Sequence, residues 1–398
     1  MINDEAIIDQ FVNAPSDSNM DGLIRYAEER DLHDTEIVKL AVALAASGQE
    51  ITHTGETYSD IPSTGGPSSL STLICPLFLS LLGDKVIKLG VPGRPAGGID
   101  VLSQIEGYQI TPGVNEVVEW VKESGYVHLL SSNTFAPLDI KLFDYRKRNN
   151  KLNLPAFVIA SLLSKKICMN VKNVGLDIRV SDFGNFGRTR DDARRNANRF
   201  NRIANLLGIK STCFITNGEE PQQPYIGRGE SILALSRIFR NEMDPMLGKH
   251  VSYCLAMAQS TSLQKSSTDL SVKSLERVFN ANVKVQGGSI ESFLEIASET
   301  QTKHSHSIKA SRTGILFIRL NKIRECLVKL QTRAGDQLFP DPAGIILTSI
   351  PYQFINKGDT ICTFRCVAAY LGEFEQALHE CFDIGMTVKE TTDFAQVI

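Results

Sequence analysis

The sequence predicts an α/β protein with a small all-α domain and a C-terminal α+β part that is rich in strands. Three features of the pattern indicate this fold class. Residues 1 to about 50 place apolar side chains at helical spacing, and short apolar strands then alternate with amphipathic helices as far as about residue 216. From about Lys309 the chain changes to short strands separated by turn residues. The alternation favours a parallel sheet covered by helices, and the later run of strands favours a separate unit.

Size and composition narrow the class of protein. The chain has 398 residues, which suggests two or three domains, with 42% apolar and 22% charged residues as in ordinary globular proteins. A net charge of −3 argues against broad nucleic-acid binding, which needs a basic surplus. The apolar run Leu73–Leu82 is too short to span a membrane, and the acidic start Met1–Glu5 does not match a signal peptide. We therefore expect a cytoplasmic protein without nucleic-acid or membrane partners.

The eight cysteines indicate neither a metal site nor a disulfide framework. They are scattered along the chain, and no Cys-x-x-Cys pair occurs. Reduced, mostly buried thiols are the expected state.

The first 50 residues predict three short helices. Apolar residues between Ile7 and Val12 share one helical face, and Ile24, Tyr26 and Ala27 suggest a second helix. The third begins at the acidic Asp34 to Glu36 and keeps an apolar stripe up to Gly48. Nothing here suggests chemistry, so we expect a packing or dimer surface.

A loop rich in glycine and hydroxyl side chains follows, from Ser63 to Leu73. It contains two glycines and six serines or threonines, and an apolar helix is expected behind it. Such a loop at a helix start offers free backbone N–H groups, hydroxyl donors and the positive end of the helix dipole, which suit an anion. A flexible Ser/Gly linker has the same composition.

A second glycine-rich loop makes the linker interpretation less favourable. The strand predicted at Lys85–Leu89 runs into Gly90–Gly98, and a helix is expected at Ile99–Ile105. Ligands of open α/β sheets sit outside the carboxyl ends of the strands, where such loops converge. The two loops together predict an anion-binding site.

The remaining elements continue the alternation of strands and helices and are followed by a C-terminal part that is rich in strands. The pattern predicts helices at Glu116–Glu123, Phe157–Cys168 and Arg190–Leu207, and strands at Tyr126–Leu130, Gly175–Val180 and Lys210–Thr216. The strand at Gly175–Val180 ends in a third loop, Ser181–Gly187. In the C-terminal part, strands are expected at Gly314–Arg319, Cys326–Val328, Gly344–Leu347 and Ile361–Phe364, followed by a helix at Phe374–Phe382.

Four short motifs occur one after another along the chain. They read Asp60-Ile61-Pro62-Ser63-Thr64-Gly65-Gly66, Pro92–Leu102, Ala160-Ser161-Leu162-Leu163-Ser164-Lys165-Lys166 and Leu176-Asp177-Ile178-Arg179-Val180. The first, third and fourth resemble the Asp-Lys-His-Ser-Thr-Gly-Gly, Ala-Ser-Ile-Leu-x-Lys-Lys and Leu-Asp-Val-Lys-Val motifs of the thymidine phosphorylase and pyrimidine nucleoside phosphorylase family. The second resembles a shortened form of the family's second glycine loop. That family is related in fold to anthranilate phosphoribosyltransferase.

The resemblance covers nearly the whole chain and implies the domain plan of a nucleoside phosphorylase or phosphoribosyltransferase. It places a small helical domain at 1–57 and 140–170, and an α/β domain that binds phosphate and nucleoside at 58–139 and 171–308. The C-terminal α+β domain would be 309–398. A homodimer formed through the N-terminal helices is implied as well.

The resemblance also implies a base site made of Arg146, Ser161 and Lys165. Arginine and lysine donate to the carbonyl oxygens of a pyrimidine, and the hydroxyl pairs with its N3 edge. Arg146 and Lys165 would also be the catalytic pair that polarises the base as it leaves, and Phe186 would pack on its face. Without the resemblance, these basic residues would be read as solvated helix faces.

The phosphate side departs from the family pattern, because Ile61 and Pro62 replace its Lys–His pair. Losing the lysine removes a charge-assisted hydrogen bond of about 1.5–3 kcal/mol, and losing the acid removes about a hundred- to ten-thousand-fold in rate. His53 could replace the histidine but reads as an ordinary loop residue. The expected phosphate ligands are Ser63, Thr64, Gly65, Gly66, Ser71, Thr72 and Arg94, with Lys88 as a further cation.

These residues lead to one hypothesis and two alternatives. The hypothesis is a divergent phosphorylase of pyrimidine nucleosides or nucleoside 5′-monophosphates, with inorganic phosphate as co-substrate and no required cofactor. The alternatives are a non-catalytic pyrimidine-binding or regulatory protein, and a phosphoribosyltransferase-like enzyme that needs magnesium. The resemblance also suggests a potassium ion at Glu230, which as a bare sequence feature is a helix N-terminal acid.

Overall fold

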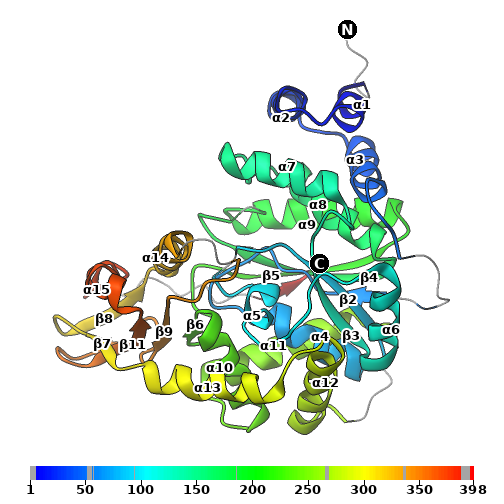
Figure 1. The fold of residues 1–398 in the computed structure, drawn as a ribbon. Helices are drawn as coiled ribbons and strands as arrows, with labels where there is room; N and C mark the ends of the chain where they lie inside the picture. The colour runs from blue at the N-terminus through cyan, green and yellow to red at the C-terminus, as the bar shows by residue number, and fades with distance from the viewer. Residues whose placement is uncertain are drawn as a thin grey trace.

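The computed structural model describes residues 6–51, 56, 58–93, 95–184, 186–264, 269–334, 338–386 and 395–398. At its centre lies a six-stranded sheet in the order β13-β5-β4-β1-β2-β3 (Figure 1). The strands from β5 to β3 are parallel, and β13 pairs antiparallel with β5 at one edge. They are β1 (Tyr58–Asp60), β2 (Lys85–Gly90), β3 (Tyr126–Leu130), β4 (Val171–Val180), β5 (Lys210–Asn217) and β13 (Ala395–Val397).

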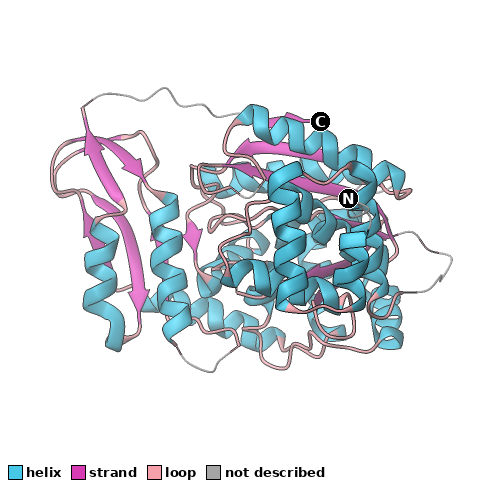
Figure 2. Ribbon diagram, turned by 90° about the horizontal axis from the view of Figure 1, so that it is seen from above, coloured by secondary structure: helices cyan, strands magenta, loops and turns pink. Residues whose placement is uncertain are grey.

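Helices cover both faces of this sheet, which explains why most residues of its strands are buried (Figure 2). In β4 every residue except Lys172 is buried. On one face α8 and α9 share a core with β4, and on the other α4, α11 and α12 build a second core. These elements and the helix beside β3 are α4 (Ser71–Leu81), α6 (Val114–Ser124), α8 (Pro155–Cys168), α9 (Arg190–Leu206), α11 (Pro245–Thr261) and α12 (Val272–Val285).

The N-terminal helices form a layer above α8 and α9 (Figure 1). They are α1 (Ala6–Asn13), α2 (Asp17–Arg30) and α3 (Asp34–Ala46), and α7 (Pro137–Arg148) joins them from later in the chain. Helix α3 packs against α8 and α9, so the apolar stripe read from the sequence faces the main core. The three predicted N-terminal helices are confirmed.

The C-terminal part contains two antiparallel sheets, one of which also takes β6 from the preceding segment (Figure 1). The strand orders are β6-β9-β11-β7 and β10-β8-β12. The strands are β6 (Tyr225–Ile226), β7 (His306–Lys309), β8 (Gly314–Ile318), β9 (Ala343–Leu347), β10 (Phe354–Ile355), β11 (Thr360–Cys366) and β12 (Phe382–Gly385). The remaining helices are α5 (Gly98–Leu102), α10 (Arg228–Phe239), α13 (Ile290–Lys303), α14 (Leu320–Arg333), η1 (Ala368–Tyr370) and α15 (Leu371–His379).

The predicted fold class is confirmed: a parallel α/β sheet, an all-helical layer and an antiparallel C-terminal part. The strand expected at Cys326–Val328 is wrong, because these residues lie inside α14. Ile323, Leu327 and Leu330 are buried at helical spacing there, and that longer period outweighs the short apolar run.

Candidate active site

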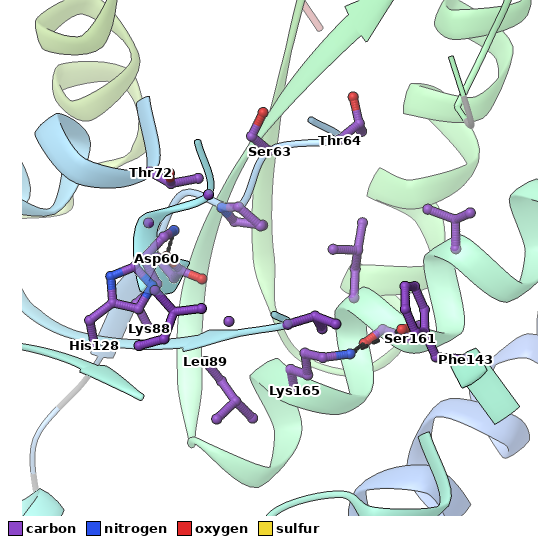
Figure 3. A pocket seen from close by; sticks show the side chains of 18 of the residues that line it. Asp60, Ser63, Thr64, Thr72, Lys88, Leu89, His128, Phe143, Ser161 and Lys165 are labelled. Atoms are coloured by element: carbon purple, nitrogen blue, oxygen red, sulfur yellow. Dashed lines mark hydrogen bonds and ion pairs between the residues drawn. The ribbon is translucent and has the colours of Figure 1, made fainter. Parts of the chain in front are cut away.

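A cavity opens at the carboxyl ends of β1, β2 and β3, between the sheet and helices α7 and α8 (Figure 3). It encloses about 930 Å³, open solvent included. Its walls come from these strand ends, from the loops after β1 and β2, and from one side of the two helices. Ligands are expected at this edge of a parallel sheet, so the cavity is the candidate active site.

The three predicted base-site residues all line this cavity: Arg146 on α7, and Ser161 and Lys165 on α8. Ser161 and Lys165 are four residues apart and share a helix face. The Nζ atom of Lys165 donates to Oγ and to the carbonyl oxygen of Ser161, each at 3.0 Å. It also donates to Asp139 of α7 in a buried ion pair. This pair with Asp139 fixes the direction of the Lys165 side chain. Asp139 was not singled out from the sequence.

Arg146 is fixed by its own loop and by an aromatic ring. Its Nε and Nη2 atoms donate at 3.1 Å to the carbonyl oxygens of Lys151 and Leu152, and its guanidinium lies 5.1 Å from the ring centre of Phe157. Burial lowers the pKa of Arg146 to about 10, so the side chain stays charged at neutral pH. In the described part of the chain Nη1 has no acceptor, which leaves it available to a ligand.

Apolar side chains surround this polar group. Phe143, Leu152, Val158 and Leu162 line the same end of the cavity. Apolar walls beside a few fixed donors suit a flat ring that carries carbonyl oxygens on its edge.

Ser63, Thr64 and Thr72 line the cavity away from Ser161 and Lys165, and Figure 3 shows the two groups apart. The turn that carries Ser63 and Thr64 is tied to β4: the Thr64 N–H donates to the Asp177 carbonyl at 2.9 Å. The Arg179 N–H donates to Thr64 Oγ1 at 3.0 Å. Thr72 lies in the first turn of α4.

The other predicted phosphate ligands do not join them. Gly65 and Gly66, both at positive φ as a tight turn allows, line a neighbouring cavity together with Arg179 and Arg324. Ser71 is fully buried and donates to Asp177 Oδ2 at 2.6 Å, so it ties α4 to β4 instead of facing a ligand. Arg94 and His53 lie outside the described residues.

A buried cluster of charges forms the floor of the cavity. Asp60 ends β1, and one of its carboxylate oxygens accepts from Lys88 Nζ at 2.7 Å while the other accepts from Lys166. The two ammonium groups hold the pKa of Asp60 at about 2, against the opposing effect of burial, so it is ionised. Lys88 of β2 lines the cavity, as the expectation of a phosphate cation requires. Asp60 and Lys166 were not singled out from the sequence.

His128 of β3 also lines the cavity and was missed from the sequence. It lies in register with Lys88 on the neighbouring strand, and Figure 3 shows the two side chains together. Its Nδ1 atom is 2.9 Å from the hydroxyl of Tyr126. Burial, reinforced by the nearby Lys88, lowers the pKa of His128 to about 3, so the imidazole is neutral at physiological pH.

The predicted role of Phe186 is corrected by its position, and the position of Glu230 shows which groups its carboxylate already binds. Phe186 is fully buried in the main core, where its ring packs edge-on against Phe200, and it does not reach the cavity. Glu230 is also fully buried, and its carboxylate accepts from Arg365 and contacts His304. Its oxygens are therefore used in an ion pair that joins α10 to β11, and a potassium ion there stays a prediction.

Comparisons with known proteins agree with this geometry. The chain is 25% identical over 356 residues to a pyrimidine-nucleoside phosphorylase of Staphylococcus epidermidis, covering 84% of this chain and 81% of the relative. It is 23% identical over 381 residues to that of Geobacillus stearothermophilus, covering 90% and 86%. The chain is a distant relative of these phosphorylases. A thymidine phosphorylase of Colwellia psychrerythraea is 24% identical over 296 residues, covering 72% of this chain and 67% of the relative.

The fold comparison points the same way. The crystal structure of anthranilate phosphoribosyltransferase from Thermus thermophilus superposes with a TM-score of 0.51 at 13% identity, covering 74% of this chain and 94% of that one. This likeness confirms the fold relationship inferred from the motifs. No protein-family model matches the chain. Among the described residues no helix combines the length and apolar character needed to cross a bilayer.

Proposed function

We propose that this chain catalyses the phosphate-dependent cleavage of the N-glycosidic bond of a pyrimidine nucleoside, releasing the free base and a sugar 1-phosphate. One observation carries the proposal: a single cavity holds Arg146, Ser161 and Lys165 at one end, and the hydroxyls of Ser63 and Thr72 away from them. The names of the distant relatives support the same class of reaction.

The base end suits a pyrimidine as leaving group. As the bond between base N1 and sugar C1′ breaks, its electron pair passes to the base and the carbonyl oxygens gain negative charge. Arg146 Nη1 and Lys165 Nζ donate to those oxygens, and each charge-assisted bond stabilises the transition state by about 1.5–3 kcal/mol. The N–H that Lys165 now gives to Ser161 Oγ is the one a base carbonyl replaces, because the pair with Asp139 is buried and charged.

The other end suits the nucleophile. A phosphate oxygen forms the new bond to C1′ on the side opposite the departing base, and the proton of the hydrogen phosphate ion balances the proton that the released base gains at N1. The hydroxyls of Ser63 and Thr72 donate to phosphate oxygens and hold the anion in line with the bond that breaks. A transition state of oxocarbenium character needs this positioning more than it needs a proton donor.

A nucleoside 5′-monophosphate is a second substrate form that the structure makes worth testing. The neighbouring cavity shares Thr64 and Leu152 with the candidate active site and presents Arg179 and Arg324. Arginine binds phosphate groups well because its planar fork pairs with two oxygens. Arg179 already donates to Asp177 and Ser69, so a 5′-phosphate that reaches past Thr64 would meet Arg324.

The test is base release by the purified chain from a panel of uridine, thymidine, deoxyuridine and their 5′-monophosphates, with and without phosphate. We expect phosphate-dependent release of base from at least one compound, and loss of that release in Lys165→Met. Lys172→Met, which removes an exposed lysine of β4, is the matched control and should behave as the wild type.

Other results would identify the alternatives. Base binding in calorimetry that ignores phosphate, without turnover, would contradict the proposal and indicate a pyrimidine-binding protein. Activity that needs magnesium and a pyrophosphorylated sugar would indicate a phosphoribosyltransferase.

A further inference from the structure

Two cysteines meet in the C-terminal part, outside the candidate active site. Cys326 lies in the middle of α14, and Cys381 directly follows Glu380, the residue that caps the end of α15. The two helices pack together, and Figure 1 shows them side by side. A hydrogen bond joins the two thiol groups. We propose that Cys326 and Cys381 form a redox site, which a hydroperoxide converts from a dithiol to a disulfide.

Hydrogen bonds of the backbone hold Cys381 against the start of α14. The N–H of Arg319, at the start of that helix, donates to the carbonyl oxygen of Cys381 at 2.8 Å. The N–H of Cys381 donates to the carbonyl oxygen of Leu378 at 2.9 Å. Lys322 and Glu380 form an ion pair between the same two segments at 3.4 Å. The backbone is thus fixed on both sides of the thiol pair, and rotation of the side chains can bring the sulfur atoms to the disulfide bond length of about 2 Å.

The two thiols differ in their access to solvent. The side chain of Cys326 is half-buried and packs on the edge of the C-terminal core, whereas Cys381 is fully buried inside that core. A hydroperoxide in solution therefore reaches the sulfur of Cys326 first. This order suits a pair in which one thiol reacts and the other resolves the product.

The charges around the pair also make Cys326 the reactive thiol. A hydrogen bond from Cys381, together with the ammonium of Lys329, lowers the pKa of Cys326. Burial and two nearby carboxylates, those of Glu325 and Glu380, oppose this shift without cancelling it. The same hydrogen bond raises the pKa of Cys381. Because the thiolate is the form that attacks a peroxide, Cys326 is the nucleophile of the pair.

The oxidation proceeds in two steps. The Cys326 thiolate attacks one oxygen of hydrogen peroxide, the O–O bond breaks, and the other oxygen leaves as hydroxide, which takes up a proton to become water. The Cys381 sulfur then attacks the sulfur of the Cys326 sulfenic acid, and the thiol proton leaves with the hydroxyl group as a second water. Both sulfur atoms are oxidised, the peroxide is reduced, and a thiol reductant reverses the disulfide.

The second step becomes favourable only after the first. The negative charge of the Cys326 thiolate is what chiefly raises the pKa of Cys381, and the sulfenic acid no longer carries it. The Cys381 sulfur also lies 3.3 Å from the carbonyl oxygen of Ala377, which accepts its S–H when Cys326 does not. The resolving thiol is thus held in place while its partner is oxidised.

A second thiol pair separates the effect of access from that of proximity. Cys75 of α4 and Cys254 of α11 are also joined by a hydrogen bond between their thiols. Both are fully buried in the core between these helices and the sheet. Peroxide does not reach them in the folded chain, so we expect this pair to stay reduced.

Helix α14 connects the redox site with the cavity next to the candidate active site. Its first turns contribute Leu320, Asn321 and Arg324 to the wall of that cavity. The disulfide therefore fixes the helix that carries Arg324 against the segment after α15.

The test treats the whole folded chain with hydrogen peroxide, alkylates the remaining thiols and identifies the linked peptides by mass spectrometry. Cleavage after glutamate separates Cys381 from Cys366, which trypsin leaves in one peptide. We expect a linked pair of peptides that contains Cys326 and Cys381, weighs two hydrogens less than the two free peptides and separates on addition of a thiol reductant. Its yield should exceed that of a link between Cys75 and Cys254 by at least about tenfold, because the thiolate of an exposed cysteine reacts much faster than a buried thiol.

Three substitutions divide the steps. Cys326→Ser should abolish the disulfide, and Cys381→Ser should leave a sulfenic acid at Cys326, which dimedone labels. Cys366→Ser is the matched control and should form the disulfide as the wild type does. It removes another half-buried thiol, whose pKa burial raises to about 11.

The wild-type chain alone can overturn the inference, so the test does not depend on whether a variant folds. Free thiols at both Cys326 and Cys381 after peroxide treatment would contradict the redox site. Equal linkage of the two thiol pairs would contradict it as well, because oxidation would then follow unfolding instead of access. Base release is not measured, so either result leaves the proposed function untouched.

Discussion

Replacing Lys165 by methionine should impair stability and activity through two separable effects. The side chain of Lys165 is 5% exposed and that of its partner Asp139 is 3% exposed. Removing one partner of a buried ion pair leaves the other charge uncompensated and costs about 3–5 kcal/mol of folding stability. The guanidinium of Arg146 also attracts the carboxylate of Asp139, as its effect on the pKa of Arg146 shows. This second positive charge offsets part of the cost, so we expect a loss of folding stability near 3 kcal/mol.

A second substitution separates stability from catalysis. Lys165→Met with Asp139→Asn removes both charges and should return the unfolding free energy to within about 1 kcal/mol of the wild type. Base release should stay about 10- to 150-fold below the wild type, because the donor to the base carbonyl is still absent. Urea unfolding measures the first quantity and steady-state kcat/KM the second, with Lys172→Met as the control for both.

The double variant can also refute the reasoning. Recovery of kcat/KM to within about threefold of the wild type would show that Lys165 only holds Asp139 in place and does not contact the base. A double variant as unstable as the single one would show that the buried charge of Asp139 is not the source of the instability.

Four further outcomes follow from the structure. Thr72→Val should raise the KM for phosphate several-fold while leaving uracil binding unchanged in calorimetry. Ser71→Ala should leave that KM unchanged but lower the unfolding free energy in urea by about 1.5 kcal/mol or more, because a hydrogen bond to a buried carboxylate is lost. The pKa of His128 is about 3 in the folded chain and about 6.5 in the unfolded chain, so between these pH values only the unfolded chain binds the proton. The free energy of unfolding should therefore fall by roughly 2 kcal/mol between pH 6.5 and 5 on account of His128. His128→Leu should remove that part of the acid sensitivity in pH-dependent urea unfolding. Glu230→Gln should lower stability by about 3 kcal/mol, since it leaves Arg365 with Asp341 alone.

The main elements could be predicted because their signals are local. The strand Tyr126–Leu130 and the start of the helix at Arg190 are found where the sequence pattern placed them. The base-site residues came from the motif on α8 and its relation to Arg146, and their meeting in one cavity needs only that α7 and α8 lie together. Helical and strand periods predict the elements without knowledge of the sheet order, whereas the base-site residues came from the resemblance to the phosphorylase family.

The residues that were missed depend on that order. Lys88, which was expected as a cation, and His128, which was missed, both lie within buried strands, and a polar residue before the end of such a strand is a signal that could have been used. Their meeting with Asp60 follows because β1 pairs with β2 and β2 pairs with β3, which no local pattern reveals. The buried positions of Ser71 and Phe186 were not predicted for a related reason, since the sequence does not show which way the side chain at a helix start or in a loop turns.

Phosphorus NMR of a reaction mixture with a pyrimidine nucleoside and inorganic phosphate tests the central claim most directly. A phosphate anion and a pyrimidine held in one cavity predict a sugar 1-phosphate resonance that grows at the same rate as free base. Free base that accumulates without phosphate, together with unphosphorylated sugar, would contradict the claim, as would the absence of any product from the whole panel.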